Sequence, residues 1–165
     1  MNLKSAFIVL AFSMASNPVP VRADGLTADA CPITRAPILP FVPPAPYPID
    51  PPAGTFWFGT SSFWTMLSAD GRWGVADENR ISEKVFWWRP GFNGAIENYP
   101  ELTVTLKRLD RPALTITAAR RATNASHESF GGSAMLTGIS VPAAGCWQVT
   151  GRHRGNEVTF VVEVG

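Results

Sequence analysis

The chain of 165 residues has little charge: 16% of its residues are charged, and its formal net charge is +1. Its hydrophobic fraction of 45% excludes an intrinsically disordered protein, which combines low hydrophobicity with high net charge. Because there is no excess of Lys and Arg to neutralise phosphates, we expect no nucleic-acid partner. The length predicts one domain, with room for an arm.

The sequence also lacks the common motifs of cofactor and catalytic sites. It contains no Walker-type loop, no Gly-x-Gly-x-x-Gly loop and no Gly-x-Ser-x-Gly nucleophile turn. The two histidines, His127 and His153, lie in polar stretches that predict loops or strand ends. Two cysteines and two distant histidines do not have the spacing of a zinc site. We therefore expect no metal, no other cofactor and no catalytic activity.

No apolar run is long enough to cross a membrane. The run of about nine residues at 6–14 falls short of the roughly 20 that a spanning helix needs, and Lys4 precedes it. We interpret residues 1–23 as a signal peptide that is cleaved after Ala23, with Ala15 as the alternative cleavage point. A short buried helix of the mature fold is the other interpretation. The prediction is a secreted or periplasmic protein with no stable membrane insertion after cleavage.

Only two cysteines are present, Cys31 and Cys146. An exported chain enters an oxidising compartment, where such a pair most simply forms one disulfide. In the chain-entropy model, a loop of this length contributes roughly 4–5 kcal/mol of stability. The alternatives are two free thiols and lipidation of Cys31.

Proline is concentrated near the start of the predicted mature chain: nine of the 15 prolines lie between residues 32 and 52. Proline fixes φ and removes an amide donor, so this segment cannot form a helix or a central strand. We predict an extended polyproline-type arm over residues 24–53. Because large apolar residues such as Leu39, Phe41 and Tyr47 are interleaved with the prolines, we expect the arm to lie along the domain surface. A ligand for a proline-recognition domain is the alternative.

Residues 54–165 contain short apolar runs that are interrupted by Gly, Pro, Asp and Asn, a pattern that predicts short strands. Leu102, Val104 and Leu106 alternate with polar residues, and a period of two predicts a half-buried strand. The segment Gly151-Arg-His-Arg-Gly-Asn156 has a glycine near each end, which predicts a hairpin loop of about five or six residues. No window shows a helical period. We predict an all-β domain, an antiparallel immunoglobulin-like β-sandwich of about seven to eight strands. The predicted strands are Thr55–Gly59, Ser62–Leu67, Lys84–Arg89, Glu101–Lys107, Pro112–Ala118, Met135–Val141, Cys146–Thr150 and Glu157–Val164.

Four short blocks stand out along residues 31–165. They are Cys31-Pro-Ile-Thr34, Phe63-Trp-Thr65 followed by Leu67, Phe86-Trp-Trp-Arg89, and Pro142-Ala-Ala-Gly-Cys-Trp-Gln-Val-Thr-Gly151 with the later Val158–Val162. The last block resembles the closing strand pair of immunoglobulin-like domains in exported bacterial proteins. Together the blocks resemble an uncharacterised family of small secreted bacterial proteins. The resemblance implies a sandwich and a bridged cysteine pair, and it implies no activity.

The tryptophans are the most distinctive side chains. Trp147 follows a Pro and Gly corner that drops it onto one face of its strand, so we predict that it anchors the core. The other five form the candidate ligand-binding set, either as a stacking platform for sugar rings or as packing for the core and arm. Trp87 and Trp88 are adjacent in one predicted strand and must point to opposite faces. At least one of them therefore faces outward or lies beneath the arm. The candidate set is Trp57, Trp64, Trp73, Trp87 and Trp88.

These features predict an exported, non-catalytic module that binds an extracytoplasmic protein or surface component. A carbohydrate-binding module that uses the Trp-rich region 57–88 is the alternative, and a glycan hydrolase with a carboxylate pair is the third reading. Basic pairs in the C-terminal half either contact an acidic partner or are solvated loop charges. The carboxylates considered are Asp70, Asp77, Glu78, Glu97 and Glu101, and the basic groups are Arg120-Arg121 and Arg152-His153-Arg154.

Overall fold

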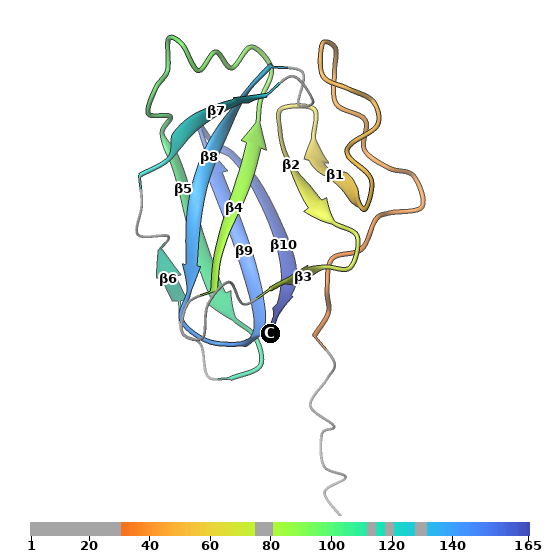
Figure 1. Ribbon diagram of the computed structural model, residues 1–165, viewed down its shortest axis with the longest axis vertical. Coiled ribbons are helices and arrows are strands. Elements are labelled where there is room, and N and C mark those ends of the chain that lie inside the picture. The colour runs from red at the N-terminus through yellow and green to blue at the C-terminus, as the bar shows by residue number, and fades with distance from the viewer. Residues whose placement is uncertain (1–30, 75–80, 112–114, 118–120, 128–131) are drawn as a thin grey trace, which may run out of the picture.

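The computed structural model describes residues 31–74, 81–111, 115–117, 121–127 and 132–165 (Figure 1). The predicted signal peptide, the first residues of the predicted arm, Asp77, Glu78 and Arg120 lie outside the described residues. Within these ranges, no helix is long and apolar enough to cross a bilayer.

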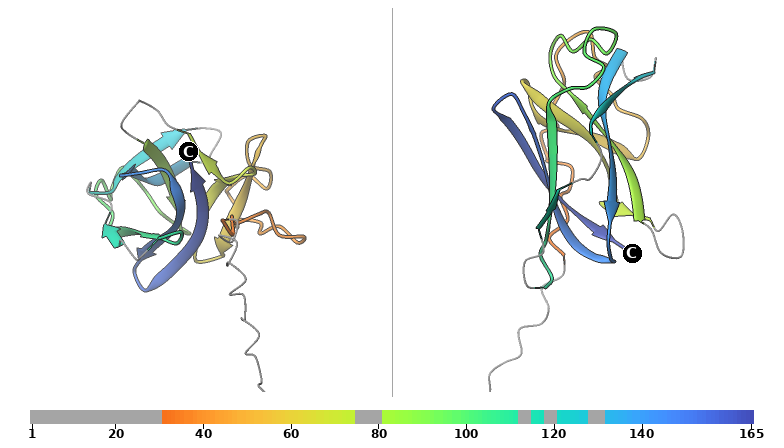
Figure 2. Two further views of the ribbon diagram at one scale, coloured as in Figure 1. Left: turned by 90° about the horizontal axis from the view of Figure 1, so that it is seen from below. Right: turned by 90° about the vertical axis from the view of Figure 1, so that its left-hand side faces the viewer.

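The described residues form ten strands in two packed sheets, as the side view in Figure 2 shows. This confirms the all-β sandwich prediction, with more strands than the seven to eight expected. The strands are β1 (Thr55–Thr60), β2 (Phe63–Ser68), β3 (Arg72–Trp73), β4 (Ile81–Trp88), β5 (Leu102–Arg108), β6 (Thr115–Thr117), β7 (Thr123–His127), β8 (Gly132–Val141), β9 (Gly145–His153) and β10 (Asn156–Val164).

The order of the strands is that of an immunoglobulin-like sandwich. The first sheet runs β1-β2-β4-β8-β7 and the second β3-β10-β9-β5-β6. The run β2-β4-β8-β7 corresponds to the four-stranded layer of that fold, and β10-β9-β5 to its three-stranded layer. All pairings are antiparallel except β3 with β10, where the chain has crossed from one sheet to the other. The chain thus changes sheets between β2 and β3, and this crossing shapes the site described below.

The core between the sheets is rich in aromatic residues. Trp87 stacks on Phe63 at 5.5 Å between ring centroids and lies 5.9 Å from Phe160 of the opposite sheet. Trp147 is fully buried, and its indole N–H donates to the Ala143 carbonyl at 3.0 Å. The prediction that Trp147 anchors the core is confirmed.

The hairpin between β9 and β10 differs from the prediction. Its strands extend to His153 and Asn156, which are paired, so Arg154 and Gly155 alone form the turn. Both have positive φ, 48° and 78°, as a tight two-residue hairpin turn requires. Gly151 lies inside β9 because the Trp87 ring packs against it; an added Cβ would lie 2.4 Å from that ring. The loop prediction was wrong because it took this packing glycine for a turn glycine.

Candidate functional site

The arm, described from Cys31 onward, is fastened along the side of the sandwich (Figure 1, orange). Cys31 forms a disulfide with Cys146, with 5.4 Å between the Cα atoms, which confirms the predicted pair. Three residues later, the Thr34 N–H donates to the Val161 carbonyl, and the Thr34 hydroxyl accepts from the Val161 N–H. The arm therefore satisfies backbone groups on the edge of β10 that would otherwise be bare.

Further along, the arm covers side chains on the outer face of the first sheet. We call the buried residues of this contact the outer cluster: Tyr47 of the arm and Trp57, Trp64, Trp88 and Ala134 of the sheet. The Tyr47 ring meets Trp64 edge-on at 5.0 Å, and its hydroxyl donates to the Arg89 carbonyl. The Trp57 indole donates to the Pro48 carbonyl at 3.1 Å. These contacts make the arm a third layer of the fold.

The five tryptophans of the candidate set are thus divided between two interiors. Trp57, Trp64 and Trp88 belong to the outer cluster, whereas Trp73 and Trp87 belong to the core between the sheets. None of the five is more than 7% exposed. A stacking platform needs open ring faces, and these rings present none while the arm is in place. The arrangement corresponds to core and arm packing.

The arm leaves other apolar side chains in solvent. Ile38 is 100% exposed, Leu39 86%, Ile49 67% and Val42 51%. They belong to the same segment that buries Tyr47 and packs Phe41 against Trp64. One side of the arm is therefore fixed to the domain, and the other is an apolar surface without a cover among the described residues.

His153, one of the two histidines considered for catalysis, is buried in a hydrogen-bond network at the end of β9. Its Nδ1 lies 2.9 Å from the Glu101 carbonyl, and the Arg89 Nε–H donates to its Nε2 at 3.1 Å. Because Arg89 can only donate, Nε2 accepts and Nδ1 carries the proton. Arg89 in turn pairs with Glu97 at 2.6 Å. Both ring nitrogens of His153 are occupied in a structural role.

Two of the carboxylates considered for a hydrolytic pair, Asp70 and Glu97, lie in different parts of the described fold. Asp70 lies in the β2–β3 turn, where the Arg72 backbone N–H and the Ser68 hydroxyl lower its pKa. Glu97 lies on the β4–β5 connection, paired with Arg89 and Arg154. The described residues include no group of three or more His, Cys, Asp or Glu side chains placed to hold a metal ion.

The basic residues considered for an acidic partner have acids or rings of this chain beside them. Arg152 pairs with Glu157 at 2.7 Å and Arg154 with Glu97 at 3.3 Å. Arg121 lies over the Tyr99 ring, 4.2 Å from its centroid. Much of the positive charge at the β9–β10 hairpin tip is therefore balanced within the domain.

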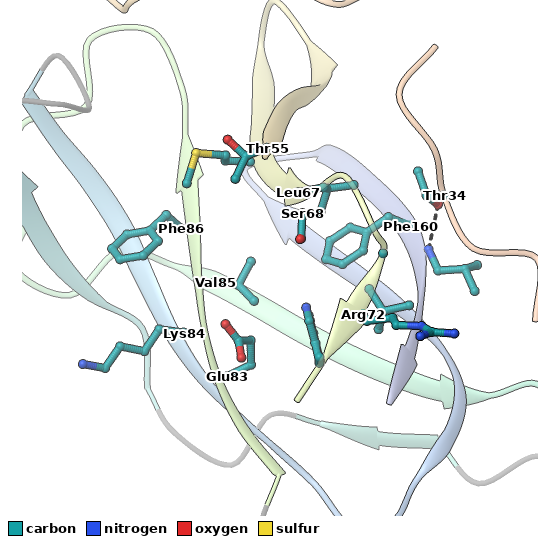
Figure 3. A pocket seen from close by; sticks show the side chains of 15 residues that line it. Thr34, Thr55, Leu67, Ser68, Arg72, Glu83, Lys84, Val85, Phe86 and Phe160 are labelled. Atoms are coloured by element: carbon teal, nitrogen blue, oxygen red, sulfur yellow. Dashed lines mark hydrogen bonds between the residues drawn. The ribbon is translucent and has the colours of Figure 1, made fainter. Parts of the chain in front are cut away.

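A cavity among the described residues opens where β2 departs from β4. It has a volume of about 310 Å³, near the lower limit of roughly 300 Å³ for ligand sites. Its walls combine apolar side chains, among them Leu67, Val85 and Phe160, with polar residues such as Thr55 and Ser68. Arg72 lies at its rim, exposed and paired with Glu163 at 3.0 Å. Figure 3 shows Glu83 and Val85 pointing from β4 toward the cavity, whereas Lys84 and Phe86 point away from it.

Glu83 places a carboxyl group on the inward face of the sheet beside this cavity, which is unusual for a charged residue. It lies on the inward face of β4, in line with the buried Val85 and Trp87. Burial raises the pKa of its carboxyl group, an effect that a hydrogen bond from the Lys84 backbone N–H opposes in part. None of the ion pairs among the described residues includes Glu83. Sequence reasoning missed it because the predicted strand began at Lys84, although its spacing from Val85 and Trp87 was a usable signal.

No protein-family model matches the chain, and no curated protein matches it in a sequence comparison.

Proposed function

We propose that the chain is an exported, non-catalytic binding module that contacts another protein outside the cytoplasm through the outward side of its proline-rich arm. The observation that carries this proposal is the apolar surface formed by Ile38, Leu39, Val42 and Ile49. Apolar side chains gathered on one short exposed segment are typical of interaction surfaces.

The mechanics of the arm support a contact role. Prolines restrict its backbone, and the disulfide and the outer cluster hold it against the sandwich. A surface held in one conformation loses little entropy when a partner binds, so more of the contact energy is expressed as affinity. An arm that served only to cover Trp64 and Trp88 would need its inward side chains alone.

A location outside the cytoplasm is consistent with the covalent structure. The disulfide between Cys31 and Cys146 persists in an oxidising compartment, and the N-terminal residues have the pattern of a signal peptide. Protein is favoured over glycan as the partner because the rings that would stack on sugars are buried. Binding is favoured over catalysis because His153 and Glu97 are committed to the network with Arg89.

Site-specific photocrosslinking tests this proposal. A photoreactive residue placed at Val42 is expected to crosslink one protein in intact cells of the host, and the substitutions Ile38→Ser and Leu39→Ser in the same chain are expected to abolish the product. The matched control is Ile96→Ser, which removes an exposed isoleucine from the β4–β5 connection. A crosslink that survives the double substitution, or one that Ile96→Ser also abolishes, would overturn the role of the arm.

A further inference from the structure

The second feature that points to a partner is the edge of β4 beside the cavity. β2 pairs with β4 only at Trp64↔Trp88 and Thr65↔Trp87. The same register would place Ser68 opposite Lys84, but β2 no longer pairs with β4 there, and the chain then crosses to the other sheet between β2 and β3. The Thr65 hydroxyl donates to the Phe86 carbonyl at 2.8 Å, so a side chain closes the ladder where the strand leaves it.

The backbone groups past this point face the gap. The N–H and C=O of one residue in an antiparallel strand point to the same edge, and the direction alternates along the strand. The Phe86 carbonyl faces β2, so the backbone groups of Lys84 and Ser82 face the same way. The Lys84 N–H bonds to the Glu83 carboxyl group, which leaves the Lys84 carbonyl and both backbone groups of Ser82 for another strand. Within the described residues, no strand pairs with this part of β4 on that side. It is a bare edge, and bare edges are templates for another strand.

The two sheets differ at this seam. On the second sheet, Thr34 of the arm, the Gly71 carbonyl and the short strand β3 all bond to the C-terminal part of β10, so this part of its edge is closed. On the first sheet, no strand of the described residues pairs with the corresponding stretch of β4, which borders the cavity. The arm and β3 therefore protect part of one edge of the sandwich, and none of the described strands covers the stretch of β4 across from it.

The charge of the cavity restricts what can bind. Arg72 is neutralised by Glu163, which leaves the inward carboxylate of Glu83 without an ion-pair partner among the described residues. A cationic side chain that enters the cavity would supply that partner, and the apolar walls would accept its methylene groups. An extended peptide fits both features, since it can pair with the bare edge and place one Lys or Arg next to Glu83.

We propose that this edge and cavity bind an extended peptide segment of a partner protein by strand addition, with a Lys or Arg side chain inserted beside Glu83. Strand addition obtains affinity from main-chain hydrogen bonds and specificity from pockets for alternate side chains. The site is separate from the apolar side of the arm, so its test is independent of the photocrosslinking experiment.

A competing role for Glu83 makes the proposal easy to test. An inward-pointing charge on an edge strand also protects the edge against unwanted pairing. If Glu83 only guards the edge, then Glu83→Gln strengthens peptide binding; if it recognises a cation, the same change weakens it. The two roles predict opposite signs for one substitution.

The probe is a capped seven-residue peptide of alternating Thr and Val with one central Lys, titrated into the oxidised ¹⁵N-labelled domain and followed by NMR. We expect amide shifts centred on Ser82, Lys84 and Val85, slower hydrogen exchange at Ser82, and about tenfold weaker binding to Glu83→Gln, which corresponds to about 1.4 kcal/mol. Glu101→Gln, an exposed change at the opposite end of the sandwich, is the control and is expected to bind normally.

Three further ligands test separately whether the cation and the peptide backbone are needed for binding. Replacing the central Lys of the peptide by Glu, or N-methylating its backbone, is expected to abolish the shifts. Butylamine alone is expected to perturb residues around Glu83 without slowing exchange at Ser82. No shifts with the Lys peptide at millimolar concentration, binding that is unchanged or stronger in Glu83→Gln, or full reproduction of the effect by butylamine would each overturn the proposal.

Discussion

The two halves of β4 belong to one continuous strand and have opposite surroundings. Its C-terminal half is enclosed on both faces: Trp87 is buried in the core and Trp88 in the outer cluster, while β2 lies alongside. Its N-terminal half has exposed Ser82 and Lys84, and the inward Glu83 borders a cavity. On their other edge, both halves pair with β8 in one uninterrupted register.

The difference shows that the neighbouring strands, rather than the strand itself, determine whether a stretch of β4 is buried or has an exposed edge. Where β2 and the arm cover β4, aromatic residues fill two interiors. Where β2 no longer pairs with β4, none of the described strands covers the edge of β4, and the Glu83 carboxylate lies beside it. Stability is therefore concentrated at one end of β4 and binding capacity at the other.

The largest expected effect comes from truncating the enclosed half. Trp88→Ala removes a buried indole from the outer cluster and is expected to lower the free energy of unfolding by about 3–5 kcal/mol. Lys84→Ala, four residues away on the same face, is expected to change it by about 0.5 kcal/mol or less. Urea denaturation of both variants measures the contrast. Equal losses would show that the two halves do not differ as described.

Removal of the disulfide loosens the cover of the enclosed half. The double change Cys31→Ser and Cys146→Ser is expected to cost about 2–5 kcal/mol, with the chain-entropy contribution of this long loop at the upper end, because the unfolded chain regains the freedom of the loop. Acrylamide quenching of tryptophan fluorescence is expected to rise in the native variant as the arm detaches at its start. Quenching identical to that of the oxidised protein would contradict the anchoring role of the bridge.

A smaller effect tests how closely the core packs against β4. Gly151→Ala places a Cβ against the Trp87 ring and is expected to destabilise the fold by about 1–3 kcal/mol. Gly74→Ala is the matched control, because a Cβ at Gly74 meets no atom within 4 Å. Thermal melting of both variants measures the difference. A variant at Gly151 that melts with the wild type would show that the ring has room to move.

The smallest effect is a pH dependence in the open half. Burial raises the pKa of Glu83 in the folded state above the ordinary value of a glutamate, so the folded state binds the proton more tightly than the unfolded state. The contribution of this group to stability is therefore lost as the pH rises from the ordinary glutamate pKa of about 4.3 through the raised pKa of the folded state. In Glu83→Gln this decline is expected to be absent. Unfolding measured across that pH window compares the two proteins, and parallel profiles would contradict the shift.

Period-two patterns in the sequence predicted many of the residues that are buried in the core. Alternation placed Leu106 and Trp147 in the core, and the adjacency of Trp87 and Trp88 required two buried faces or an outward ring. The cysteine pair was predicted because the chain has no other cysteines. These predictions succeeded because the burial of apolar side chains produces a periodic pattern in the sequence.

The features that sequence reasoning missed depend on neighbours distant in the chain. β7 has a polar sequence and exists through its pairing with β8, while β3 is two residues long and brings Trp73 to 6.3 Å from Phe160. The bare edge at Lys84 arises because β2 stops pairing at Thr65. No local pattern records where a neighbouring strand departs or which face an arm covers.

Hydroxyl-radical footprinting of the oxidised protein, resolved by residue and normalised to the urea-unfolded chain, tests most directly whether the arm encloses the outer cluster. We expect strong protection of Trp57, Trp64 and Trp88 and almost none of Ile38 and Leu39, because one side of the arm is buried and the other is in solvent. Oxidation of the three tryptophans at the rate of the unfolded chain would show that the arm does not cover them and would contradict the account.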